Sequence, residues 1–381
     1  MKPSLIFSLF LQTIALFALG QAAPAPSPAT AARAPGASPE ILPDRHVTFR
    51  LKAPQANEVA VSGQGFAGRV PMSKDESGQW SATVGPFEPG IFEYSFTVDG
   101  VQMIDPGNPW IKPQRQPRTS ILHIAGDPPQ IWDFQGVPHG TLHEHNYQSK
   151  TVGEMWRFDV YTPPGYERDS TTKFPVLYLI HGFGDNYAAW SVHGKAHWIL
   201  DNLIAQGRAR PMIVVMPDGH PIAPGTRPRD EYGKANADSF EHELIDEIVP
   251  LVESTYHVRA EAAGRAIAGL SMGGGHSLQT GLRHLDTFAW IGAFSAGLPS
   301  QERLSETIAN ADALNQNLKL FWIACGKKDS LVERNRQFEA QLTEKGIHHT
   351  WRETDGDHSW PVWRRYLAEF APLLFSQSPA K

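Results

Sequence analysis

The chain is poor in cysteine, in positive charge and in long apolar runs. Cys325 is the single cysteine among 381 residues, so no disulfide can form within the chain. The 40 acidic residues outnumber the 34 basic ones, and the resulting net charge of −6 argues against nucleic acid or an anionic membrane as a partner. The apolar run at residues 5–19 is interrupted by polar residues and is short for a transmembrane helix, which needs about 20 residues.

Residues 1–23 instead predict a cleaved secretory signal peptide. Lys2 gives the positive start, residues 5–19 give the apolar core, and small residues follow where cleavage is expected. No cysteine follows this core, which argues against a lipoprotein anchor. An exported chain without disulfides is expected in a bacterial periplasm or secreted into the medium. Residues 24–43, rich in Pro, Ala and Ser, predict an extended linker.

The next stretch, residues 44–125, carries strand signals and no long helical pattern. Alternating runs are separated by turn residues, and Asp99-Gly100 is a tight-turn signal between two of them. Several short strands with turns between them predict a small β-sandwich of the immunoglobulin type. Trp80 and Trp110 have aromatic faces that suit sugar rings, which would make this domain a carbohydrate-binding module. The alternative is that both tryptophans pack in a core or an interface.

From residue 126 to residue 381 the pattern changes to strands that alternate with helices. Apolar runs typical of strands buried on both faces occur at residues 174–180, 212–216, 265–268, 290–294 and 320–324. Helical patterns occur at residues 196–206, 240–256, 276–284, 333–345 and 362–374. Pro250 is expected to kink or restart the second of these helices. The alternation predicts an α/β domain whose mostly parallel sheet is covered by helices on both faces.

The sequence RAIAGLSMGGG at residues 265–275 predicts a strand, a sharp turn and a helix, with Ser271 at the turn. A serine in this position sits in strained backbone with its hydroxyl exposed, which suits a nucleophile. Three successive glycines are poor helix formers, each costing up to ~1 kcal/mol relative to alanine. Their presence at a helix start therefore indicates close backbone packing. A bare G-x-S-x-G also occurs by chance, so this interpretation depends on the rest of the chain.

A serine hydroxyl needs a base to become a nucleophile, and the base needs an orienting acid. His358 is the predicted base, because it lies in a turn-rich loop late in the chain from which it can reach the serine. Asp329 is the predicted acid, because it follows the strand predicted at residues 320–324 and so lies at the carboxyl edge of the sheet. Three other aspartates are rivals for the acid: Asp218, Asp355 and Asp357.

Such a site also needs donors for the oxyanion of a tetrahedral intermediate. One predicted donor is the backbone N–H of Met272, directly after the serine, and the other is the N–H of Phe183, in the loop HGFG at residues 181–184. Each such donor lowers the barrier by ~3 kcal/mol. Trp190 and Trp360, near the active loops, are predicted to contact an aromatic acyl group or a sugar; the alternative is that they only pack these loops.

No metal or organic cofactor is predicted. The pair His143 and His145 has the H-x-H spacing of some metal sites, but no third ligand with a convincing spacing accompanies it. Nucleophilic catalysis by a serine, a histidine and an aspartate needs no metal.

Longer motifs connect these residues. In chain order they include Tyr161-Thr-Pro-Pro-Gly-Tyr, Tyr178-Leu-Ile-His-Gly-Phe-Gly-Asp, Val215-Met-Pro-Asp-Gly-His, Ala268-Gly-Leu-Ser-Met-Gly-Gly-Gly and Gly356-Asp-His-Ser-Trp. Together they resemble the esterase D-like branch of the α/β-hydrolases over residues 137–375, and more narrowly the feruloyl and acetylxylan carbohydrate esterases. The motifs Pro89-Gly-Ile-Phe-Glu-Tyr and Asp105-Pro-Gly-Asn-Pro resemble the early-set, immunoglobulin-like domains that precede the catalytic domain in some secreted esterases.

The resemblance implies an α/β-hydrolase fold, a triad of Ser271, Asp329 and His358, and ester hydrolysis through an acyl-enzyme without a cofactor. The implied substrate is an ester-bearing carbohydrate of the plant cell wall, feruloylated or acetylated, or a small aromatic ester. The same branch includes enterochelin-type siderophore esterases, and this alternative needs a basic pocket for an anionic ligand. Three residues could supply it: Arg227, Arg229 and Lys234. A non-catalytic glycan-binding protein is the alternative of another class, although the intact triad argues against it.

Overall fold

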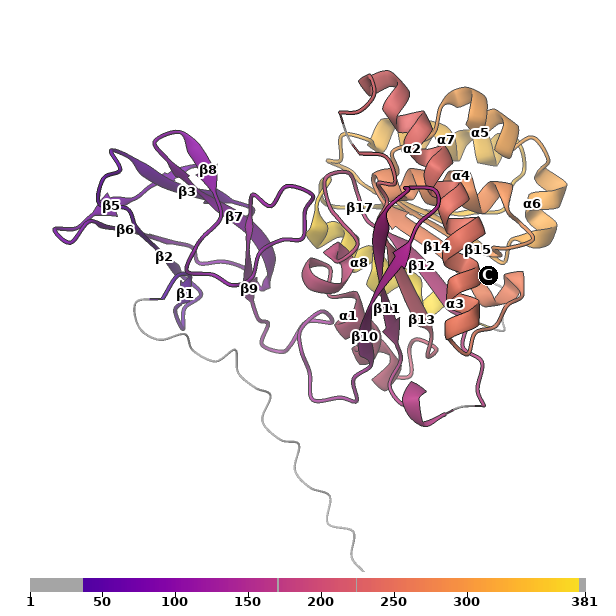
Figure 1. Ribbon diagram of the computed structural model, residues 1–381, viewed down its shortest axis with the longest axis horizontal. Helices are drawn as coiled ribbons and strands as arrows, with labels where there is room; N and C mark the ends of the chain where they lie inside the picture. The colour runs from indigo at the N-terminus through magenta and orange to yellow at the C-terminus, as the bar shows by residue number, and fades with distance from the viewer. Residues whose placement is uncertain (1–36, 170, 224, 377–381) are drawn as a thin grey trace, which may run out of the picture.

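The computed structural model describes residues 37–169, 171–223 and 225–376, which form two adjoining domains (Figure 1). The predicted signal peptide and residues 24–36 of the predicted linker lie outside the described residues. Of the helices that the structure describes, none combines the length and the apolar character that a membrane span requires.

The first domain consists of two antiparallel sheets that share one apolar core. The strand order is β1-β2-β6-β5 in one sheet and β4-β3-β7-β8 in the other, where β9 also pairs with β7. The strands are β1 (Glu40–Ile41), β2 (Val47–Lys52), β3 (Val59–Gly63), β4 (Val70–Pro71), β5 (Ser73–Lys74), β6 (Gln79–Val84), β7 (Gly90–Val98), β8 (Val101–Met103) and β9 (Ser120–Ile124). This architecture is compatible with an immunoglobulin-like sandwich. Because β1 pairs with β2, the folded part begins inside the segment predicted as a linker up to residue 43.

Two features of this domain bear on predictions made from the sequence: the turn at Asp99-Gly100 and the degree of burial of two tryptophans. Asp99 (φ 45°) and Gly100 (φ 86°) form the tight turn that joins β7 to β8, which confirms the predicted turn. Trp80 is buried in the core and its Nε1–H donates to the Ala53 carbonyl oxygen, which confirms the core alternative for Trp80 over a sugar contact. Trp110 is 59% exposed.

The second domain is organised around an eight-stranded sheet with the order β10-β11-β13-β12-β14-β15-β16-β17. β10 and β11 are antiparallel to their neighbours, whereas β13, β12 and all later strands run parallel. The strands are β10 (Thr141–Gln148), β11 (Met155–Thr162), β12 (Val176–Ile180), β13 (Ile213–Pro217), β14 (Arg265–Leu270), β15 (Trp290–Phe294), β16 (Leu320–Gly326) and β17 (Thr350–Thr354). The sheet belongs to the α/β-hydrolase fold class that the sequence predicts.

Helices cover both faces of this sheet (Figure 1). Successive residues of β12 alternate between two cores: Leu177 and Leu179 pack with α1 and α8, and Tyr178 packs with α2, α3, α4 and α7. The helices are α1 (Ala196–Ala205), α2 (Arg229–Glu243), α3 (Val249–Thr255), α4 (Met272–Arg283), α5 (Gln301–Thr307), α6 (Ala311–Asn317), α7 (Val332–Glu344) and α8 (Trp360–Phe370). Short helical turns are η1 (Tyr166–Arg168), η2 (Ala189–His193), η3 (Leu244–Ile248), η4 (Ala262–Gly264) and η5 (Ala371–Leu373).

Helix boundaries differ from the prediction at two places. The helix predicted at residues 240–256 is the later part of a longer element, in which η3 joins α2 to α3. Pro250 lies in the first turn of α3, where its missing N–H is tolerated, so the helix restarts there as predicted. Helix α4 begins at Met272 and not at residue 276, so the three glycines form its first turn, where a Cβ atom on Gly273 or Gly275 would meet neighbouring backbone.

Candidate active site

Ser271 lies at the sharp turn between β14 and α4. Its backbone has φ 52° and ψ −115°, and holding a non-glycine residue in such a region costs on the order of 1–3 kcal/mol. The Ser271 N–H donates to the Phe294 carbonyl oxygen (2.8 Å), and the Ser271 carbonyl accepts from the N–H groups of Gly297 (2.7 Å) and Gly275 (3.1 Å). The neighbouring strand and the helix therefore hold the strained turn, which is the conformation expected for an exposed nucleophile.

The glycines after Ser271 allow α4 to approach the surrounding backbone. A Cβ atom on Gly273 would lie 2.4 Å from the His181 carbonyl oxygen, and one on Gly275 would lie 2.1 Å from the Gly297 carbonyl oxygen. Both positions require glycine, because these neighbours are backbone atoms that cannot rotate away. The predicted close packing is confirmed, and it brings the start of α4 against the loop that begins at His181.

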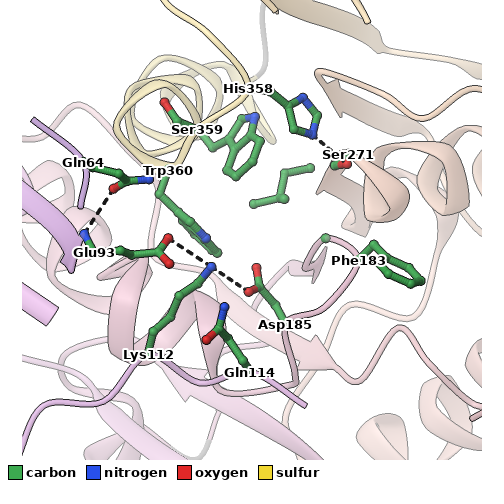
Figure 2. Close-up of a pocket in the computed structure, with 13 residues that line it drawn as sticks. Gln64, Glu93, Lys112, Gln114, Phe183, Asp185, Ser271, His358, Ser359 and Trp360 are labelled. Atoms are coloured by element: carbon green, nitrogen blue, oxygen red, sulfur yellow. Dashed lines mark hydrogen bonds and ion pairs between the residues drawn. The ribbon is translucent and has the colours of Figure 1, made fainter. Parts of the chain in front are cut away.

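His358 lies between β17 and α8 and connects Ser271 to Asp329. Its Nε2 is 2.9 Å from Ser271 Oγ, and its Nδ1 is 2.9 and 3.0 Å from the two carboxylate oxygens of Asp329. A carboxylate can only accept, so Nδ1 carries the proton and Nε2 accepts from the serine hydroxyl. The structure thus brings the three predicted residues into one chain of hydrogen bonds, whose serine and histidine appear in Figure 2.

Asp329 is 3% exposed and follows β16. Burial alone would raise its pKa, but hydrogen bonds from His358, the Leu331 N–H and Ser295 outweigh burial, and the pKa of Asp329 is lowered. The carboxylate is therefore kept ionised beside the imidazole. The rival aspartates have other partners: Lys327 for Asp355, Ser359 for Asp357 and His181 for Asp218.

Ser295 is a supporting residue that the sequence did not reveal. It follows β15, has φ 47°, and is one of the hydrogen-bond partners that lower the pKa of Asp329. Its Oγ also accepts from Trp363 Nε1 (3.1 Å), and the Trp363 ring packs edge-on against His358 with 4.9 Å between ring centroids. Serine is common at strand ends, so the sequence does not set Ser295 apart from other serines. Its contact with Asp329 does, and this contact is seen only in the structure.

The predicted oxyanion donors adjoin Ser271. Gly182 and Phe183 line the same pocket as the serine, and a Cβ atom on Gly182 would lie 3.4 Å from Ser271 Cβ. Met272 is the first residue of α4, and N–H groups in the first turn of a helix have no acceptor within the helix. Phe183 is 63% exposed, and Figure 2 shows its ring directed away from Ser271.

A pocket of about 180 Å³ opens at Ser271 between the two domains. Leu270, Trp360 and Trp363 give it an apolar wall. Figure 2 shows a charged group, Glu93, Lys112 and Asp185, across the pocket from Ser271 and His358. The pocket therefore offers both an aromatic surface and hydrogen-bonding groups to a bound molecule.

The two tryptophans predicted to contact substrate are placed differently. Both are almost fully buried: Trp360 is 1% exposed and lines the pocket, whereas Trp190 is 0% exposed and is not among the lining residues, with 4.9 Å between the two ring centroids. Trp190 Nε1–H donates to the Ile180 carbonyl oxygen (3.1 Å), which fixes its ring against the sheet. The predicted contact is therefore corrected for Trp190, which supports Trp360 and does not face the pocket.

The first domain contributes pocket residues that the sequence analysis missed: Gln64, Glu93, Lys112 and Gln114. They occur in three separate segments of a domain whose packing against the second domain no local pattern reveals. Arg227 and Lys234, considered for a basic pocket, are not among the lining residues. The lining instead combines two carboxylates with one ammonium group.

The two histidines with H-x-H spacing have protein partners. His143 Nε2 is 2.9 Å from Thr162 Oγ1, and His145 Nε2 is 2.5 Å from the Tyr256 hydroxyl. Within the part of the chain that the structure describes, no three His, Cys, Asp or Glu side chains are grouped so that they could hold a metal ion.

Comparison with known proteins places these features in a family context. The sequence profile of the family named Esterase matches residues 149–374, more than half of the chain. An endo-1,4-beta-xylanase/feruloyl esterase of Xylanibacter ruminicola is 33% identical over 343 residues, which cover 88% of this chain and 46% of that protein. An acetyl esterase of Caldicellulosiruptor saccharolyticus is 25% identical over 51% of this chain and 80% of its own length. The chain thus spans about half the length of the xylanase/feruloyl esterase.

Solved structures show the same fold. A CE1 ferulic acid esterase from Anaeromyces mucronatus in complex with ferulic acid superposes with a TM-score of 0.57 at 29% identity, covering 64% of this chain and 93% of that chain. An enterochelin esterase from Shigella flexneri gives a TM-score of 0.64 at 19% identity and covers 87% of this chain and 92% of that chain. The second similarity extends over more of the chain but concerns the fold alone.

Proposed function

The chain belongs to the Esterase family, and on this premise we propose that it hydrolyses carboxylic esters on plant cell-wall carbohydrate, of the feruloyl or acetyl-xylan type. One observation carries the proposal: Ser271 Oγ, His358 and Asp329 are linked by hydrogen bonds of 2.9–3.0 Å, and Ser271 and His358 line an open pocket. This is the geometry that activates a serine hydroxyl.

In the proposed reaction Ser271 Oγ attacks the ester carbonyl carbon while His358 Nε2 takes the hydroxyl proton. The N–H groups of Met272 and Phe183 stabilise the oxyanion, and Asp329 stabilises the imidazolium. Collapse of the intermediate breaks the C–O bond, and His358 protonates the departing alcohol. Water, deprotonated by His358, then attacks the acyl-enzyme and releases the carboxylic acid and free Ser271. Atoms and charge balance without a metal or cofactor.

The substrate proposal draws on the pocket and on the named relatives. Leu270, Trp360 and Trp363 form an apolar wall against which a planar acyl group can pack, although each is largely buried. Gln64, Gln114 and Ser359 line the same pocket and carry groups that can hydrogen-bond to hydroxyl substituents. The names of the relatives include feruloyl esterase and acetyl esterase, and one solved relative holds ferulic acid. Export by a signal peptide at residues 1–23 would bring the enzyme to such a substrate.

An enterochelin-type siderophore esterase is the second candidate; the likeness to the enterochelin esterase covers 87% of this chain and concerns the fold alone. Its ligand is anionic, whereas the pocket lining combines two carboxylates with one ammonium group. A glycan-binding protein without activity is the candidate of another class, and Trp110, exposed on the first domain, would be its contact.

The test is hydrolysis of methyl ferulate, nitrophenyl acetate, acetylated xylan and a catecholate siderophore by the wild type and by Ser271→Ala. We expect turnover of ferulate or acetylated xylan that falls by up to ~10⁶-fold in the variant. Ser305→Ala, at an exposed position on α5, is the matched control and should keep wild-type turnover. Siderophore turnover alone would support the second candidate, and glycan binding without any turnover would contradict an enzymatic function.

A further inference from the structure

A segment of the first domain lies directly against the predicted oxyanion loop. The Arg115 N–H donates to the Gly184 carbonyl oxygen (3.0 Å), and Gln114 pairs with Asp185 in an isolated antiparallel bridge. Asn186 Nδ2 donates to the Gln114 carbonyl oxygen (3.4 Å). The two segments therefore pair through their backbones immediately after Phe183, the predicted second donor.

A buried ion cluster strengthens this pairing. Lys112 Nζ is 2.9 Å from Asp185 Oδ1 and 3.0 Å from Glu93 Oε1, and the three side chains are 8%, 6% and 14% exposed. Burial would lower the pKa of Lys112, but the two carboxylates outweigh burial and raise it, so the ammonium stays charged. Figure 2 shows Lys112 between the two carboxylates. Lys112 thus joins β7 of the first domain to the loop after β12 of the second.

A second buried connection reaches the histidine loop. Arg364, on α8, is 1% exposed and donates to the Ile91 carbonyl oxygen on β7 (3.1 Å) and to the His193 carbonyl oxygen (3.1 Å). Helix α8 begins two residues after His358. The first domain is therefore joined, through β7, both to the loop of the predicted oxyanion donor and to the helix that follows the predicted base.

We propose that the first domain is part of the catalytic machinery, with Lys112 as a positioning residue that fixes the Gly182–Asp185 turn for oxyanion binding. The inference rests on the proposed ester hydrolysis. A donor misplaced by a fraction of an ångström stabilises the transition state less while leaving ground-state binding nearly intact. Loss of Lys112 should therefore lower kcat more than it raises KM.

The test uses the full chain with Lys112→Met, which keeps the length of the side chain and removes its charge. We expect kcat for nitrophenyl acetate to fall on the order of 10- to 100-fold with KM changed less than threefold. Lys112→Arg, which can still bridge both carboxylates, should recover most of the loss. Lys52→Met, at an exposed lysine on β2 whose Nζ donates to Ser77, is the matched control and should keep wild-type kcat.

The fraction of correctly folded sites is measured by titrating the serine with a phosphonate ester, and kcat is expressed per titrated site. A defect that disappears after this correction would overturn the proposal, because it would reflect lost folding only. A rise in KM at constant kcat would also overturn it, since Lys112 would then act in ground-state binding. If the wild type and Ser271→Ala are equally inactive, the proposed function itself fails; an active wild type with unaffected Lys112→Met contradicts only this inference.

Discussion

Asp329 and Asp185 are two buried carboxylates whose pKa values shift in opposite directions: Asp185 lines the pocket, and Asp329 contacts the pocket residue His358. They are 3% and 4% exposed, and each follows a strand of the same sheet. Hydrogen bonds from His358 and other donors outweigh burial and lower the pKa of Asp329. At Asp185 burial dominates, the carboxylate of Glu93 adds to it, and Lys112 offsets it only in part, so the pKa is raised.

The difference lies in the number of donors that each carboxylate has to itself. Asp329 receives the imidazole N–H and the Leu331 N–H, so its charge is favourable in the fold and can stabilise an imidazolium. Asp185 shares the single ammonium of Lys112 with Glu93, so its charge is less favourable and its contribution is to hold the two domains together. Equal burial therefore does not imply an equal role.

Replacing Asp329 should have the largest effect. Asp329→Asn keeps the shape but removes the charge and allows the wrong tautomer of His358, so we expect kcat to fall by ~10⁴-fold on any ester that the wild type hydrolyses. Steady-state kinetics on nitrophenyl acetate measure the loss. Asp355→Asn, an exposed aspartate in the same loop as His358, is the control and should keep kcat within about twofold of wild type. If Asp329→Asn kept kcat within tenfold of wild type, a residue other than Asp329 would be the carboxylate that orients His358.

The triad and the loop at residues 181–184 could be predicted because each of these residues lies in a local pattern. The strand, turn and glycines around Ser271, the glycine-containing loop before Asp185 and the position of Asp329 after a buried strand are all visible in short windows. Edges of parallel strands meet in space, so these windows also predict that their residues come together.

The charged group of Glu93, Lys112 and Asp185 could not be predicted, because it depends on how the two domains pack. Glu93 and Lys112 lie in a β-domain with nothing in their neighbours to indicate a partner at Asp185. The prediction that Trp190 contacts substrate also failed, because it depended on the position of Trp190 near an active-site loop in the sequence. That position does not show whether the ring is buried. For Trp80 the sequence left two alternatives open, because alternation along a strand shows that one face is buried but not which one, and the structure places Trp80 in the core.

Replacing Asp185 should have a smaller and non-additive effect. Asp185→Asn keeps the backbone pairing with Gln114 but removes one of the two ion pairs that Lys112 makes. We therefore expect kcat to fall only on the order of tenfold. Since Lys112 and Asp185 act through the same contact, the double variant should lose little more than Lys112→Met alone. Combining Lys112→Met with Asp355→Asn, which share no contact, gives the additive reference. Full additivity for Lys112 and Asp185 would contradict a common role.

The smallest predicted effect is the pH dependence of stability. The folded pKa of Asp329 is below its ordinary value of 3.8, so its stabilisation is fully present above pH 3.8 and is lost as the pH falls through the folded pKa. The folded pKa of Asp185 is above 3.8, so its protonated form favours folding and this contribution is lost as the pH rises through the raised pKa. The two substitutions should therefore change the pH profile in opposite directions.

Urea unfolding followed by tryptophan fluorescence, at a series of pH values on both sides of 3.8, measures this difference. The free energy of unfolding of Asp329→Asn should be lower than that of the wild type, and this difference should grow as the pH rises, because only the wild type gains an ionised, hydrogen-bonded carboxylate. For Asp185→Asn the free energy of unfolding should rise relative to that of the wild type over the same pH range. Only the wild type must ionise a carboxyl group there, and burial disfavours the ionised form. Slopes of the same sign for both variants would show that Lys112 supports Asp185 as fully as His358 supports Asp329, and the contrast between the two carboxylates would then be lost.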